Sequence, residues 1–256
     1  MNISRALAIT VVAALAACSR AAPPASPAPP APQPAPTRAP AAVARQLPNE
    51  IRWFRNAAEY RALARQAYQI AGDRLAELTR GLAPQRWAVI LDADETVLDN
   101  SEYERWRFVL DSGYTDASWA AWVDERMAPA VPGAPEYARR VHAMGGRVVI
   151  VTNRAESLCD ATRANLASIG FAADVVLCQA PGESDKNPRF QKVQSGTAAA
   201  GVPPLTVVEW IGDNILDFPG MTQAMRNSPA AFADFGKRYF VLPNPMYGSW
   251  TQNKTP

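Results

Sequence analysis

The sequence predicts an α/β protein built on a doubly wound, mostly parallel sheet with a mainly helical cap. Two observations lead to this prediction. Short runs rich in β-branched residues alternate with stretches of helical periodicity, which is typical of βαβ units. The runs are also continuously apolar, as expected for strands that are buried on both faces of a parallel sheet. The expected strands are 87–91, 147–151, 174–178, 206–211 and 239–242.

Helical periodicity predicts the elements between these strands. Apolar residues recur at three- and four-residue spacing over 51–80, which indicates one long amphipathic helix ended by Gly81 and Pro84. Further helices are expected near 134–144 and 155–168. Residues 101–130 follow the first strand and are rich in Trp, Tyr and acidic side chains, so we expect them to form the cap.

The first 45 residues are expected to lie outside the folded domain. Arg5 and an apolar run that is too short to span a bilayer predict a signal peptide over 1–17. Residues 18–45 are expected to be Cys18 plus a tether, because the stretch from Ala21 to about Arg45 is almost entirely Ala and Pro, cannot form a core and should be extended. The folded domain is therefore expected over 46–256.

The end of the apolar run suggests where the protein resides. Leu15-Ala-Ala-Cys18 is similar to a bacterial lipobox, so Cys18 is predicted to be the lipidated N-terminus, an ordinary signal peptide with a chance cysteine being the alternative. Ser19 after the cysteine favours the outer membrane. We therefore expect an exported lipoprotein, anchored in the membrane and facing the periplasm or the cell surface.

Charge and cysteine usage restrict the partners and the redox chemistry. The net charge is +2 and no basic stripe is present, which argues against binding a nucleic acid polymer but leaves small phosphorylated substrates open. An exported protein can keep disulfides, so Cys159 and Cys178 are expected to form a bridge or to remain as two buried thiols.

Polar residues follow four of the predicted strands, where ligands bind in sheets of this kind. Asp92 and Asp94 follow the first strand, and paired carboxylates can divide the roles of nucleophile and proton carrier. Thr152 and Asn153 follow the second strand and precede a helix, an arrangement that suits phosphate. A capping role for each of these residues is the simpler alternative.

The later strand ends add a base and more acids. Lys186 follows the third strand and would neutralise a phosphoryl group, although a solvated surface lysine is the simpler interpretation. Asp213 lies at the tip of the fourth strand, and Mg²⁺ prefers carboxylate oxygens of this kind. The order and spacing of the four strand ends are more specific than any one of them.

These residues resemble the haloacid dehalogenase superfamily, and within it the class C acid phosphatases, the bacterial lipoprotein 5′-nucleotidase family. The similarity covers most of residues 52–251. The strings that carry it are Ala58-Glu-Tyr-Arg-Ala-Leu-Ala64, Asp92-x-Asp-Glu-Thr-x-Leu-Asp-Asn-Ser101, Val151-Thr-Asn-Arg154, Gly212-Asp-Asn-x-x-Asp-Phe218 and Leu242-Pro-Asn-Pro-Met-Tyr-Gly-Ser-Trp250.

The resemblance implies a Mg²⁺-dependent phosphomonoesterase. It implies that Asp92 attacks phosphorus and forms an aspartyl-phosphate, and that Asp94 acts as general acid and then as base. The Asp92 carboxylate, the Asp94 backbone carbonyl and Asp213 would hold Mg²⁺. Thr152, Asn153 and Lys186 would bind the phosphoryl group, and Asp217 would orient the metal shell or Lys186. The family further suggests a homodimer with an acidic optimum.

The resemblance also implies a substrate class. Trp119 in the cap and Tyr247 near the C-terminus match positions at which the family stacks an aromatic ring, so nucleoside monophosphates and similar small aromatic phosphate esters are the expected substrates. Both residues being core aromatics is the alternative.

Two points remain open. Pro188 lies within the lysine segment, so Arg189 or Lys192 could replace Lys186. The alternative function is a non-catalytic surface lipoprotein that binds, for example, haem; His142 is the only imidazole in the chain, on a helix predicted to lie far from the strand ends.

Overall fold

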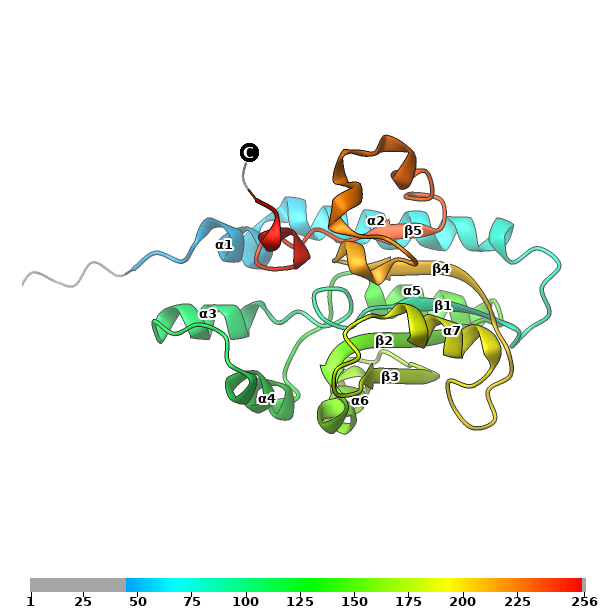
Figure 1. The fold of residues 1–256 in the computed structure, drawn as a ribbon, viewed down its shortest axis with the longest axis horizontal. Helices are drawn as coiled ribbons and strands as arrows, with labels where there is room; N and C mark the ends of the chain where they lie inside the picture. The colour runs from blue at the N-terminus through cyan, green and yellow to red at the C-terminus, as the bar shows by residue number, and fades with distance from the viewer. Residues whose placement is uncertain (1–44, 255–256) are drawn as a thin grey trace, which may run out of the picture. The chain divides into compact units, whose positions relative to one another are not determined.

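The computed structural model describes residues 45–254 and contains a five-stranded, fully parallel sheet in the order β3-β2-β1-β4-β5 (Figure 1). The strands are β1 (Trp87–Leu91), β2 (Arg147–Ala155), β3 (Val175–Gln179), β4 (Thr206–Gly212) and β5 (Tyr239–Val241). All five predicted strands are present within a few residues of their expected bounds. The predicted sheet is therefore confirmed, with β1 in its centre.

The two faces of the sheet are covered by different elements. Alternate β1 residues point in opposite directions, so Val89 and Leu91 join a core with helices α2 (Ala58–Leu78), α5 (Ala134–Ala143) and α6 (Cys159–Ser168). Ala88 and Ile90 face a second core formed with α7 (Asn187–Ser195) and residues 215–235. Helices or turns on both faces define the doubly wound architecture.

The prediction of one helix over 51–80 was wrong. The chain forms α1 (Asn49–Asn56) and α2, separated by Ala57 in an extended conformation (φ −75°, ψ 135°). Helix α1 packs against the cap helix α3 (Ser101–Val109), whereas α2 packs against α5 and the sheet. Phe54 and Tyr60, on either side of the break, are buried against each other with ring centroids 3.9 Å apart.

The predicted cap is mainly helical, as expected. It contains α3 (Ser101–Val109) and α4 (Asp116–Glu125), which lie together beside the end of β1 from which the chain enters the cap (Figure 1). Thr115 begins α4 as a capping box, its hydroxyl accepting from the Ser118 amide at 3.1 Å. The cap side chains Tyr103, Trp122 and Val123 are buried in the core.

Two further features were open or unpredicted. Cys159 at the start of α6 and Cys178 in β3 are joined by a disulfide, with their Cα atoms 5.9 Å apart. Of the predicted helix over 155–168, residues 156–158 form a 3₁₀ turn that leads into α6. Helix α7 was not predicted as an element, because Pro188 near its start hides the helical pattern, although proline is acceptable in a first helical turn.

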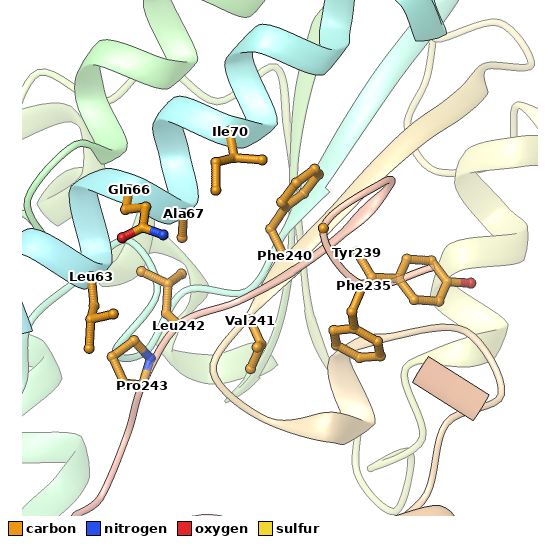
Figure 2. Close-up of a pocket in the computed structure, with 11 residues that line it drawn as sticks. Leu63, Gln66, Ala67, Ile70, Phe235, Tyr239, Phe240, Val241, Leu242 and Pro243 are labelled. Carbon is orange, nitrogen blue, oxygen red and sulfur yellow. The ribbon is translucent and has the colours of Figure 1, made fainter. Parts of the chain in front are cut away.

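An apolar groove of about 340 Å³ runs along the β5 edge of the sheet. Figure 2 shows Leu63 and Ile70 of α2 on one side of it and Phe240 and Leu242 on the other. None of the predicted site residues lines this groove. Across residues 45–254, no helix is both long and apolar enough to cross a membrane.

Candidate active site

Three carboxylates meet where β1 and β4 end. The parallel register places Leu91 opposite Ile211, and the Asp92 amide continues this pairing by donating to the Ile211 carbonyl at 3.0 Å. Asp92 and Asp213 therefore emerge side by side. Asp217 joins them from the 3₁₀ turn Ile215–Asp217, and one oxygen from each of the three carboxylates lies within 4.8 Å of the others.

Gly212 makes this convergence sterically feasible. A Cβ atom at this position would lie 2.3 Å from the Asp217 side chain. Any other residue would push Asp217 away from the strand end. The glycine of the Gly-Asp string is thus required by the approach of one acidic side chain.

Lys186 lies between two of these carboxylates. Its Nζ donates to Asp92 Oδ1 at 2.5 Å and to Asp217 Oδ1 at 2.6 Å, and all three side chains are buried. Burial disfavours the ammonium form, but the nearby Asp217 and Asp92 carboxylates outweigh it and raise the Lys186 pKa. Of the three candidate cations, Lys186 is the one that the structure places on Asp92.

The two alternative cations have other positions. Lys192 is exposed on α7. Arg189 is buried and donates to the Thr152 carbonyl and to the Asn153 side-chain oxygen, so it supports the end of β2. The Thr152 hydroxyl accepts from the Arg154 amide at 3.1 Å, and its own proton remains available for a phosphoryl oxygen.

The buried acids outnumber the buried base. The pKa of Asp92 is raised to about 7, because burial and the charges of Asp217 and Asp94 together outweigh the lowering effect of Lys186. The pKa of Asp213 is also raised, first by burial and then by Asp217 and Asp92. One ammonium against three clustered carboxylates leaves excess negative charge in a desolvated site. A hard divalent cation with oxygen ligands fits this donor set.

Asp94 lies next to this cluster and is held by a side chain that sequence reasoning did not assign. Arg154 donates to Asp94 Oδ1 from Nε at 2.9 Å and from Nη2 at 2.7 Å, and Asn100 donates to the same oxygen at 2.9 Å. Both residues lie within the strings that suggested the family. The sequence carried no direct signal for Arg154, because the predicted strand ended at residue 151, whereas β2 continues to Ala155 and buries the arginine, which then needs a partner.

The two predicted stacking residues, Trp119 and Tyr247, lie on different segments of the chain, on α4 and in the loop after β5. Trp119 lines a cavity of about 610 Å³, together with Tyr114, Asp116, Asn153 and residues of the β2–α6 and β3–α7 connections. Tyr247 is not among the lining residues of this cavity. It lies in the loop after β5, which is fixed to the β4 end where Asn244 donates to Asp213 at 2.8 Å.

Two further residues named in the sequence analysis are His142 and Cys18. His142 lies on α5, and its Nε2 forms a 2.8 Å hydrogen bond with Asp174 Oδ2, which is not a site residue. Cys18 falls outside the described residues.

Comparison with known proteins agrees with this geometry. The family model described as HAD superfamily, subfamily IIIB (acid phosphatase) matches residues 30–250. Acid phosphatase 1 of Solanum lycopersicum is 29% identical over 160 residues, which are 62% of this chain and 57% of the tomato protein. The chain thus spans somewhat more than half the length of this relative.

Two solved structures are also similar. The class C acid phosphatase from Bacillus anthracis has 30% sequence identity and a TM-score of 0.69, over 78% of this chain and 84% of the other. The same enzyme with tungstate bound has a TM-score of 0.68 at the same identity and coverage.

Proposed function

Because this chain belongs to the HAD superfamily, subfamily IIIB of acid phosphatases, we propose that it is a metal-dependent phosphomonoesterase that acts through an aspartyl-phosphate. The single observation that supports this most strongly is Lys186 bridging Asp92 and Asp217 at the joined ends of β1 and β4. A nucleophile and a fixed ammonium within hydrogen-bonding distance are what phosphoryl transfer requires, since its catalysis is largely positioning and charge stabilisation.

Asp92 is the proposed nucleophile. Lys186 holds Asp92 Oδ1, which fixes the direction of the carboxylate and leaves Oδ2 to face phosphorus or a metal ion. As the carboxylate bonds to phosphorus, the ester P–O bond breaks and its electron pair stays on the leaving oxygen. Lys186 also remains near the phosphoryl oxygens, whose negative charge it stabilises, and Asp217 keeps the ammonium in place.

Asp94 is the proposed proton carrier. It follows the nucleophile by two residues, so both carboxylates face the same crevice at the end of β1. It gives a proton to the leaving oxygen and later takes one from the water that hydrolyses the aspartyl-phosphate. Thr152 and Asn153, supported by Arg189, are positioned to donate to the phosphoryl oxygens.

We propose Mg²⁺ as the metal, held by the Asp92 carboxylate, Asp213 and the Asp94 backbone carbonyl. When bound, the cation neutralises phosphoryl charge and fixes the position of the substrate. Asn244 and Thr96 donate to the two Asp213 oxygens at 2.8 and 3.3 Å, which orients this carboxylate as a ligand.

The proposed substrates are nucleoside monophosphates and similar small aromatic phosphate esters. Trp119 supports this assignment because it presents a ring at a cavity that Asn153 connects to the phosphoryl site. Trp119→Ala should raise KM for a nucleoside monophosphate about tenfold, since base stacking contributes about 1–3 kcal/mol. KM for a small aliphatic phosphate ester should not change.

The decisive experiment is hydrolysis of p-nitrophenyl phosphate by purified protein with Mg²⁺, with EDTA, and with the Asp92→Asn variant. Turnover that requires both Mg²⁺ and Asp92 supports the proposal. A folded, Mg²⁺-supplied protein without turnover would reject it and leave the non-catalytic binding lipoprotein as the better hypothesis.

We further propose that the enzyme is an exported lipoprotein anchored through Cys18. The lipobox-like string before this cysteine supports the assignment. Mass spectrometry of the N-terminal peptide from membrane fractions tests it: a diacylglyceryl-modified Cys18 is expected, and an unmodified chain that still begins at Met1 would reject it.

A further inference from the structure

The hydrogen bonds to Asp94 all converge on one of its two oxygens. Oδ1 accepts from Arg154 Nε at 2.9 Å, from Arg154 Nη2 at 2.7 Å and from Asn100 Nδ2 at 2.9 Å. Within residues 45–254, Oδ2 accepts no hydrogen bond. Arginine commonly spans both oxygens of a carboxylate with parallel bonds, whereas here its fork closes on one oxygen and leaves the other free.

The chemistry of these donors decides which oxygen can carry a proton. Guanidinium N–H and amide N–H groups donate and cannot accept. A proton on Oδ1 would therefore point at other hydrogen atoms and would displace at least one donor. A proton on Oδ2 disturbs none of the three bonds, and the Asp94 side chain, 18% exposed, is open to a substrate.

The two donors are themselves fixed from several sides. Arg154 and Asn100 are almost fully buried, and Arg154 Nη2 also donates to Asn100 Oδ1 at 3.1 Å. The backbone N–H of Asn100 donates to the buried Glu95 carboxylate at 2.7 Å. Neither donor can turn away from Asp94 without leaving a buried polar group unpaired, which costs about 1–3 kcal/mol.

The cap completes this arrangement. Trp122 of α4 donates from Nε1 to Asn100 Oδ1 at 2.8 Å. Trp119, one turn earlier on the same helix, places its ring 5.4 Å from the Arg154 guanidinium carbon. Helix α4 therefore contacts both donors, and the Asp94 environment depends on the position of the cap.

We propose that Arg154 and Asn100 are positioning residues that assign the catalytic proton to Asp94 Oδ2, and that Trp122 holds them in place from the cap. This inference rests on the proposed function. As the Asp92 carboxylate bonds to phosphorus and the ester P–O bond breaks, the Oδ2 proton moves to the leaving oxygen. Asp94 is then a carboxylate whose Oδ1 is still held by the three donors, and Oδ2 is ready to accept a proton from water.

The test uses leaving groups of different basicity. Loss of a general acid slows departure of a poor leaving group, such as the sugar hydroxyl of a nucleoside monophosphate, much more than departure of p-nitrophenolate, which needs little protonation. First-turnover release of each leaving group isolates this step from the later hydrolysis of the aspartyl-phosphate, in which Asp94 acts as base for every substrate.

The variants are Arg154→Met, which removes two donors, and Trp122→Phe, which keeps the packing and removes only the indole donor. With Arg154→Met, we expect first-turnover release of nucleoside to fall about 10²-fold and release of p-nitrophenol to fall less than about threefold. Trp122→Phe should show the same selectivity with a smaller loss, about three- to tenfold. Arg154→Lys, which restores one cationic donor, should recover part of the loss.

Arg140→Gln is the matched control, because Arg140 is an exposed arginine on α5 that pairs with Asp73 and lies outside the site. Both release rates should be unchanged in this variant. Equal losses for both leaving groups in folded Trp122→Phe and Arg154→Lys would overturn the inference and leave a structural role only. Absence of turnover in the unmodified protein would instead reject the proposed function.

Discussion

Replacing the nucleophile should inactivate the Mg²⁺-supplied enzyme and make the metal-free protein more stable at neutral pH. Asp92 is buried, and its pKa of about 7 lies far above the ordinary 3.8. The carboxylate form therefore destabilises the fold. This cost is absent below about pH 4, grows between pH 4 and 7, and is complete above pH 7.

The expected magnitude follows from the same values. A difference between about 7 and 3.8 corresponds to about 4 kcal/mol at roughly 1.4 kcal/mol per pH unit, which is an upper bound for removing the charge. In Asp92→Asn, an amide oxygen can still accept from Lys186, but the attraction between opposite charges is lost. We therefore expect a net gain of about 1–3 kcal/mol in unfolding free energy at pH 8 in EDTA. With Mg²⁺ supplied, we expect activity to fall by at least about 10⁴-fold.

Urea denaturation in EDTA at pH 8 and at pH 4.5 measures this gain. The stabilisation by Asp92→Asn should be present at pH 8 and should largely disappear at pH 4.5, where the Asp92 carboxyl of the unmodified protein is protonated in the folded state. The reverse pH dependence, or a variant that is less stable at pH 8, would refute the charge argument. Saturating Mg²⁺ should remove the difference or reverse it, because only the unmodified protein keeps all the proposed ligands.

The remaining predictions concern one site residue and two structural features. Lys186→Met should lower kcat about 10²-fold or more while the protein stays folded at pH 5, measured with p-nitrophenyl phosphate beside circular dichroism; unchanged kcat would remove Lys186 from the mechanism. Glu209 is buried in β4, and its pKa is raised to about 8 because burial outweighs the Tyr137 hydrogen bond and the nearby arginines. Glu209→Gln should therefore increase the unfolding free energy above pH 8 and change it little at pH 5. An increase that does not depend on pH would contradict this. Cys159→Ser removes the disulfide to Cys178, 19 residues away, and should lower the unfolding free energy measured by urea denaturation by about 3 kcal/mol. A reductant should cause the same loss in the unmodified protein and no further loss in the variant.

The sequence alone was sufficient to predict the sheet and the residues at its edge. Continuous apolar runs report burial on both faces directly, and Asp92, Asp94, Thr152 and Asp213 each follow such a run. Parallel strands have their carboxyl ends at one edge of the sheet, where ligands bind, so the residues that follow the predicted strands could be expected to lie near one another in a candidate site. The interrupted helix at Ala57 was missed because the periodicity continues through the break while the packing partner changes.

Only the tertiary structure decided which side chains meet. The family resemblance favoured Lys186 but left Arg189 and Lys192 open, because all three follow the same strand and their distances from Asp92 depend on how the β3–α7 connection folds back over β1. The Arg154 and Asn100 contacts with Asp94, and the cap tryptophan above them, likewise join segments that lie far apart along the chain. Local patterns record whether a residue is buried and in what kind of element. The geometry between distant residues is set by strand order and by the cap, and these arise from packing of the whole chain.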